Sequence, residues 1–254
     1  MRGSKLNWFF DFSLGNPNLE PEKTWKGRLE WERRFTPRMA LTISLFHDDM
    51  SDTQDLIPLS LCAGPGSVEA GTCGLADIRT LDGAGNIGRG KRTGIETRFG
   101  APLDFLGIPN AEIRFMGKLQ ETSVTDPVTE ETREFSLEQA WNYNASFRQE
   151  LPELNFAWGA ALKRQSQYFE YKLAEQSYFN RDADKLDLFF ETTAIRGLTL
   201  RFAVTNISPT PEDRVRTFYA GSRASGVVTR YEARKQYASL EGSRVLSIRA
   251  AGVF

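Results

Sequence analysis

Residues 244–254 read RVLSIRAAGVF, a run in which small or apolar side chains occupy every second position. Successive side chains of a β-strand point to opposite faces, so this run predicts a strand with one apolar face. That face holds Leu246, Ile248, Ala250, Gly252 and Phe254. The other face carries an arginine and a serine, and the strand ends on an aromatic residue.

The same alternation recurs along the chain. In residues 25–35, aromatic and apolar side chains alternate with a second face that is entirely charged: Lys26, Arg28, Glu30, Glu32 and Arg34. A soluble protein would have to bury such faces without water, which is costly. We predict nine strands, with residues 6–14 as a candidate tenth: 25–35, 41–45, 95–99, 111–119, 141–147, 156–162, 186–190, 198–204 and 246–254. In these strands, Leu29, Ile43, Ile113 and Leu119 would face lipid, and Thr42 and Gln120 would face water.

Connections of two lengths separate these strands. Short ones fall near 36–38, 151–155 and 194–197, with a moderate one at 100–110. Long loops are expected at 50–86, 123–138, 169–184 and 207–240. Short turns on one side and long loops on the other are typical of an antiparallel outer-membrane barrel. The fold class predicted is therefore all-β, an antiparallel transmembrane β-barrel.

Composition is compatible with this fold but does not reveal it. The chain has 254 residues, 40% hydrophobic residues and a net charge of -1, which is also the profile of a soluble protein. No apolar run reaches the roughly 18 residues that a membrane-spanning helix needs. In a barrel only every second residue faces lipid, so mean hydropathy stays ordinary. The near-neutral charge gives no basic footprint for nucleic acid.

One segment makes the prediction specific. Gly15-Asn16-Pro17-Asn18-Leu19-Glu20-Pro21-Glu22 resembles the Gly-Asn-Pro-x-Leu-x-Pro-Glu signature of TonB-dependent outer-membrane receptors. Weaker matches follow in the family's order at 6–9, 94–96, 198–206 and 242–244, so the resemblance covers residues 6–254. It implies the last nine or ten strands of a 22-stranded barrel whose N-terminal plug has no counterpart here. Residues 1–5 carry no export signal and are interpreted as a truncated or added start.

The resemblance also implies a function. The parent protein would be an active transporter in the outer membrane of a Gram-negative bacterium, taking up a scarce ligand such as a ferric siderophore. Energy would come from the TonB complex through the missing plug, and no enzymatic activity or cofactor is expected. The barrel-assembly machinery would recognise the outward row of Leu246, Ile248 and Phe254, and the isolated piece would be inactive. A passive porin or adhesin barrel, or an outer-membrane hydrolase, remains the alternative.

Ligand contacts are expected in the last long loop, where charge and aromatic surface combine. The candidates are Arg214, Arg216, Phe218, Tyr219, Arg223, Arg230, Tyr231 and Arg234. An arginine-rich loop would suit an anionic ligand or lipopolysaccharide phosphates.

Three further groups of residues have alternative interpretations. Cys62 and Cys73 favour a disulfide, worth roughly 3 kcal/mol, over free thiols or a metal site. His47, Asp48 and Asp49 are the one cluster that could be read as catalytic. Neighbours in a strand point to opposite faces, so His47 and Asp48 cannot form a direct dyad, although His47 and Asp49 could share a face. A solvated acidic rim is the favoured interpretation. The glycines at 83, 85, 88, 90 and 94 are expected in a flexible loop that enters a strand.

Overall fold

The structure, a computed structural model, describes residues 16, 18–62, 78–180, 184–195, 197–207, 209, 212–236 and 243–252. These residues form β-strands and three short 3-10 turns, without an α-helix. Every strand pairing is antiparallel. The all-β antiparallel prediction is confirmed.

Nine strands form the main sheet, and they are the nine predicted ones. They are β1 (Lys23–Thr36), β2 (Met39–Ser51), β5 (Gly90–Pro102), β6 (Ala111–Thr125), β8 (Trp141–Leu151), β9 (Phe156–Gln165), β12 (Lys185–Thr192), β13 (Leu198–Thr205) and β16 (Val245–Gly252). Their order in the sheet is their order in the chain, and the short β7 (Thr132–Arg133) adds to β6. Over the described residues the sheet stays open, with β1 and β16 as its edges.

Two smaller sheets occupy segments expected to be long loops. One consists of β10 (Tyr168–Tyr171), β11 (Glu175–Asn180), β14 (Glu212–Tyr219) and β15 (Val228–Gln236); the other pairs β3 (Gln54–Cys62) with β4 (Ile78–Asn86). The loop prediction was therefore wrong over much of 50–86, 169–184 and 207–240. An apolar row was the signal used to find strands, and in β14 the alternate positions are charged instead: Glu212, Arg214 and Arg216.

The glycine-rich segment also differs from its prediction. Gly83 and Gly85 lie within β4, and Gly90 and Gly94 lie within β5, so they do not form a flexible loop. Only Gly88, in the short turn between these strands, has a left-handed backbone, with φ of 94°.

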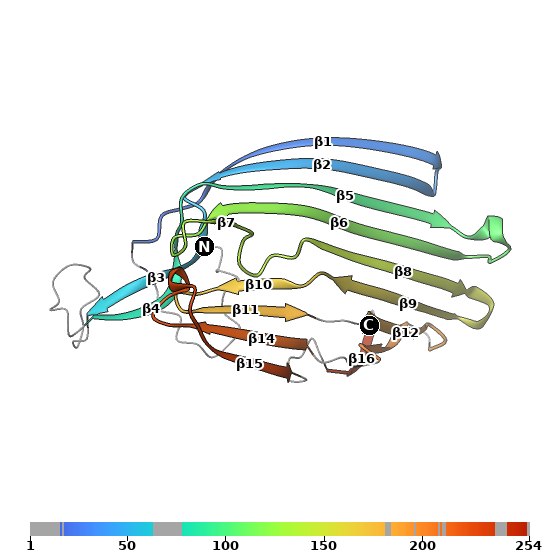
Figure 1. Cartoon of the computed structure of the whole chain (residues 1–254). Helices are drawn as coiled ribbons and strands as arrows, with labels where there is room; N and C mark the ends of the chain where they lie inside the picture. The colour runs from blue at the N-terminus through green and yellow to red at the C-terminus, as the bar shows by residue number, and fades with distance from the viewer. Residues whose placement is uncertain are drawn as a thin grey trace.

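Figure 1 shows the turns β1–β2, β5–β6 and β8–β9 at one end of the sheet and the β3–β4 hairpin at the opposite end. Two of the short turns are 3-10 turns, η1 (Asp104–Leu106) and η2 (Pro152–Leu154), and η3 (Arg223–Ser225) joins β14 to β15. Asn155 ends η2 in the left-handed conformation that asparagine tolerates. The predicted division into a short-turn end and a long-connection end is therefore present.

Burial is concentrated near the long connections. Met50, Val124 and Phe135 form the buried apolar cluster there, with Ile87 packed against it. No helix of the described residues is long and apolar enough to cross a membrane.

Candidate functional site

One face of the main sheet is apolar from edge to edge. The strand register aligns a row across five strands: Leu29, Leu45, Ile95, Leu119 and Trp141. A second row crosses seven strands: Ala101, Ile113, Phe147, Ala160, Leu188, Val204 and Leu246. Leu29 is 68% exposed and Leu246 is 74% exposed. An exposed apolar surface of this extent marks a contact with lipid or protein.

The opposite face is polar. One row contains Glu30, Ser44, Glu96, Lys118, Asn142 and Gln165. The next contains Glu32, Thr42, Arg98, Met116, Asn144, Lys163 and Lys185. The predicted apolar and polar faces are therefore present in the strands that these rows cross.

Ion pairs on the polar face join different strands, and some of them reach across an intervening strand. Arg28 lies 2.5 Å from Glu96, and Glu191 lies 3.0 Å from Arg148 and 3.3 Å from Arg201. Charges on this face are thus satisfied largely by one another.

Gln120 differs from its prediction. Rather than facing open water, it is buried, and its amide nitrogen donates hydrogen bonds to the Glu138 carboxylate and the Gln139 carbonyl.

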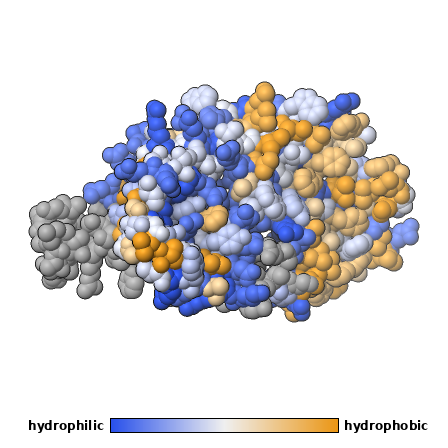
Figure 2. All heavy atoms as spheres, in the orientation of Figure 1, coloured by the Kyte–Doolittle hydropathy of each residue, from blue (hydrophilic) through white to orange (hydrophobic). Residues whose placement is uncertain are grey.

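Figure 2 shows where these surfaces gather on one side of the molecule. Apolar atoms are concentrated toward the end with the short turns, and polar atoms dominate toward the β3–β4 end. The apolar surface is therefore a zone of the sheet, separate from the long connections.

The predicted ligand contacts do lie near one another, but on a hairpin instead of a loop. Four are on β14, three are on β15 and one is in η3: Arg214, Arg216, Phe218 and Tyr219; Arg230, Tyr231 and Arg234; and Arg223. Arg214 and Arg216 contact acidic groups of the neighbouring strands. Arg216 Nη2 lies 2.5 Å from Glu175, and Arg214 Nη2 lies 3.6 Å from both Glu170 and Glu175.

Glu175 is the buried carboxylate that holds Arg214 and Arg216 in place. Burial alone would raise the pKa of its carboxyl group, but hydrogen bonds from Arg216 and Ser177 keep that pKa below the ordinary value. On β15, Arg230 and Arg234 lie 3.1 and 3.9 Å from Glu232. The arginines that the sequence offers to an anion are thus already balanced by carboxylates within the protein.

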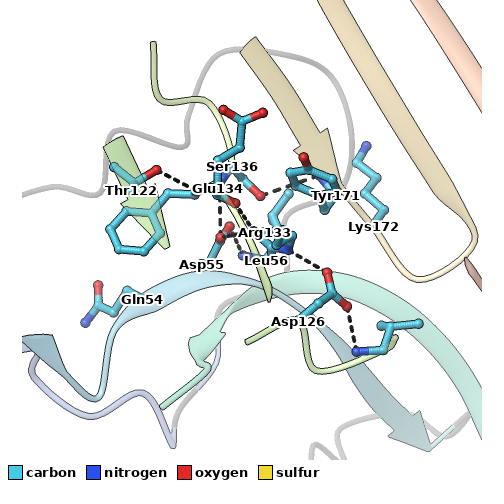
Figure 3. Close-up of polar contacts among 12 residues, drawn as sticks. Gln54, Asp55, Leu56, Thr122, Asp126, Arg133, Glu134, Ser136, Tyr171 and Lys172 are labelled. Atoms are coloured by element: carbon cyan, nitrogen blue, oxygen red, sulfur yellow. Dashed lines mark hydrogen bonds and ion pairs between the residues drawn. The ribbon is translucent and has the colours of Figure 1, made fainter. Parts of the chain in front are cut away.

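A second ionic cluster ties the long connections together. We call it the loop clamp, and its members come from five elements: Asp55 of β3, Asp126 after β6, Arg133 of β7, Tyr171 of β10 and Arg223 of η3. Arg133 lies 2.8 Å from Asp55 and 2.5 Å from Asp126, and Arg223 donates to both oxygens of Asp126 at 3.0 and 2.7 Å. Both guanidinium groups also lie over the Tyr171 ring. Figure 3 shows Asp55, Asp126 and Arg133 converging beside Tyr171.

The loop clamp is buried and electrically balanced. The side chains of its four charged members are at most 7% exposed, with two carboxylates facing two guanidinium groups. Burial alone would raise the pKa of Asp126, but hydrogen bonds from the Val128 amide, Arg223 and Arg133 hold it below its ordinary value. Burial raises the pKa of Tyr171 to about 12. A neutral, buried cluster of this kind fixes loop positions and leaves little charge for a ligand.

The signature segment contacts the β3–β4 hairpin. Of the signature residues, Asn16, Leu19, Pro21 and Glu22 are described, whereas Gly15 and Pro17 lie outside the described residues. Asn16 donates from Nδ2 to the Ala84 carbonyl at 3.1 Å. The Gln54 amide donates to Glu22 Oε2 at 3.2 Å. The segment therefore holds the hairpin to the start of β1.

The remaining site predictions have mixed outcomes. Leu246 and Ile248 are each 74% exposed on the apolar face of β16, whereas Phe254 lies outside the described residues. Cys73 and the Cys62 side chain also lie outside them, so the disulfide stays a prediction. His47 and Asp48 have different partners: His47 Nδ1 lies 2.7 Å from the Thr93 hydroxyl, and Asp48 lies 3.6 Å from Arg92.

Sequence reasoning missed Asp126, Arg133 and Glu175. Asp126 has a local signal, because it precedes a proline and its Oδ1 caps the amides of Val128 and Thr129 in a turn. Its pairing with Arg223 spans 97 positions and leaves no local pattern. Among the described residues, no group of three or more His, Cys, Asp or Glu side chains is placed to hold a metal ion.

Comparisons with protein-family models, with curated proteins and with solved structures give no match for this chain.

Proposed function

We propose that this chain forms part of the wall of an outer-membrane β-barrel that belongs to a TonB-dependent active transporter. The transporter takes up a scarce ligand, such as a ferric siderophore, across the outer membrane of a Gram-negative bacterium. The signature at 15–22 and the order of the weaker motifs support this family.

The observation that carries the proposal is the pair of unbroken apolar rows on one face of nine antiparallel strands, opposite rows rich in charge. Side chains that alternate between lipid and an aqueous interior produce this arrangement. A soluble sheet would normally cover its apolar face with a second layer.

The two edges of the sheet indicate that the barrel needs strands beyond these nine. β1 and β16 each pair on one side only within the described residues. A bilayer interior supplies no water to satisfy backbone N–H and C=O groups, so a membrane barrel must close. The proposed barrel therefore needs further strands, and this part alone is not expected to transport.

Matched arginine substitutions test the lipid contact. Phe115 and Met116 are neighbours on β6, point to opposite faces and are 37% and 54% exposed. In protein inserted into phospholipid vesicles, Phe115→Arg should lower the free energy of unfolding by about 2 to 4 kcal/mol, because its charge meets hydrocarbon. Met116→Arg should cost much less. Urea titration followed by tryptophan fluorescence measures both.

A second pair repeats the comparison at the edge. Ile248 and Ser247 are both exposed on β16, again on opposite faces. If arginine is tolerated equally at all four positions of the complete protein inserted in the membrane, the outer-membrane proposal fails. A passive porin or adhesin would give the same insertion result, and a ligand uptake assay with and without the proton gradient in cells carrying the complete protein separates it from an active transporter.

A further inference from the structure

A hollow lies on the polar face of the main sheet. Its volume is about 460 Å³, within the size range of small-molecule sites. Side chains of the two polar rows surround it: Glu96, Arg98, Met116, Lys118, Asn142, Asn144, Lys163, Gln165 and Lys185. Between these rows, Thr97, Gly117 and Tyr143 point to the other face, so their backbone forms the floor. The hollow is separate from the predicted β14–β15 contacts.

Cations outnumber carboxylates around the hollow. The polar rows contribute Arg98, Lys118, Lys163 and Lys185, whereas Glu96 is the one carboxylate among the described lining residues. Lys163 is paired with Asp187 at 2.8 Å, so an anion would be held mainly by Arg98 and Lys118. Glu96 is shared by two arginines, with Arg28 at 2.5 Å and Arg98 at 3.8 Å.

Lys118 is the cation with the least compensation. Its ammonium lies 5.4 Å from the centre of the Phe46 ring, and no carboxylate of the described residues lies within ion-pair distance of it. The nearby acids Asp48 and Glu138 are held by Arg92, at 3.6 and 2.7 Å.

Amide side chains add hydrogen-bond donors to the same wall. Asn142 and Gln165 lie in the first polar row, and Asn144 lies in the second. The N–H groups of such amides can donate hydrogen bonds to an anionic oxygen.

We propose that this hollow binds a small anionic solute that carries phosphate or carboxylate groups. Lys118 and Arg98 contact the anion, and the side-chain amides of Asn142 and Asn144 orient it. A charged group that meets ammonium and guanidinium groups in a partly enclosed site forms charge-assisted hydrogen bonds, which are stronger than neutral ones. Binding here depends only on the polar face, so it is independent of whether the apolar face meets lipid or the protein uses TonB.

Isothermal titration calorimetry on the full chain, folded in zwitterionic detergent, tests the site. The probes are pyrophosphate and tricarballylate, with trehalose as a neutral solute. We expect both anions to bind, with affinity falling as sodium chloride is raised from 50 to 300 mM, and trehalose not to bind. Lys118→Gln should weaken the anions about tenfold or more, the loss expected for one hydrogen bond to a charged group. Lys118→Arg should stay within about threefold of the original.

Lys91→Gln is the matched control. Lys91 is an exposed lysine on β5, the same strand as Glu96 and Arg98, but its side chain is on the opposite face. This variant makes the same change in net charge and should leave binding unchanged. The circular dichroism spectrum shows whether Lys118→Gln folds like the original protein. If it does not, Arg98→Gln gives a second test of the hollow.

Three outcomes would overturn the site. They are no binding of either anion by the folded protein, equal affinity in Lys118→Gln and Lys91→Gln, and trehalose binding as tightly as the anions. If a glutamate decapeptide binds through Lys118 while both small anions fail, the hollow is a contact for an acidic protein segment instead, and the small-solute proposal is wrong.

Discussion

Asp126→Asn should release the loop clamp. Asp126 is 1% exposed and accepts hydrogen bonds from two backbone amides, from Arg133 and twice from Arg223. An asparagine keeps one acceptor oxygen but turns an amide donor toward the guanidinium groups. Asp55 then remains as the one carboxylate beside two buried cations. Removing one partner of a buried ion pair costs about 3 to 5 kcal/mol.

Hydrogen exchange followed by mass spectrometry measures this loss locally. Peptides from β10–β11 and from η3 should exchange faster by between roughly one hundred- and several thousand-fold, since each 1.36 kcal/mol is a factor of ten. Peptides near the β1–β2 turn should not change. The matched control is Asp104→Asn, because Asp104 pairs with Arg38 in an exposed turn at the other end. That pair should contribute less than about 1 kcal/mol.

Acid provides an independent check on the same carboxylate. Because the pKa of Asp126 is lower in the folded protein than in the unfolded chain, its contribution is present above about pH 4 and is lost as the pH falls through the folded value. The protection factors of the clamp peptides, which correct for the pH dependence of intrinsic exchange, should therefore fall below about pH 4, and Asp126→Asn should lack this step. If the exchange of the clamp peptides in Asp126→Asn matches that in Asp104→Asn, the clamp does not hold these connections.

The other predictions concern alkaline pH, packing and the cysteines. Tyr171, with a pKa of about 12, should contribute stability below pH 10 that is lost as the pH rises toward 12, and the latest step in absorbance at 295 nm should vanish in Tyr171→Phe. Gly159→Ala should destabilise the sheet by about 1 to 3 kcal/mol in a urea titration, because the new Cβ would lie 2.4 Å from the Phe147 carbonyl oxygen; Gly100→Ala, with its nearest contact at 4.0 Å, should not. In protein from an outer membrane, Cys62 and Cys73 should resist thiol labelling under denaturing, non-reducing conditions, and quantitative labelling of both would contradict the disulfide.

The sheet could be predicted because its signal is local. Each strand of the main sheet repeats an apolar side chain every second residue, and this period alone identifies the strand and its two faces. The β14 strand was not predicted because the residues at its alternate positions are charged. Arg214 and Arg216 occupy positions where the other strands have leucine or phenylalanine. The pairing of these arginines with Glu175 of β11 makes that charged face stable within a sheet.

The candidate sites were harder to predict because they depend on distant pairings. An arginine-rich segment is visible in the sequence, but its acidic partners are not, since Arg216 and Glu175 are 41 positions apart. The hollow needs the register of four strands before Arg98, Lys118 and Lys163 come together. A single sequence contains these residues without saying which of them are neutralised.

Neutralisation decides which positive residues are available to an anion. In the loop clamp, two guanidinium groups face two buried carboxylates, and binding an anion there would require breaking those pairs. On the β14–β15 hairpin, Glu175 and Glu232 likewise contact the arginines. Lys118 has no such partner among the described residues, and its neighbour Glu96 already serves two arginines. An incoming anion therefore displaces no existing ion pair of Lys118, and this difference moves the expected ligand contact from the hairpin to the polar face of the sheet.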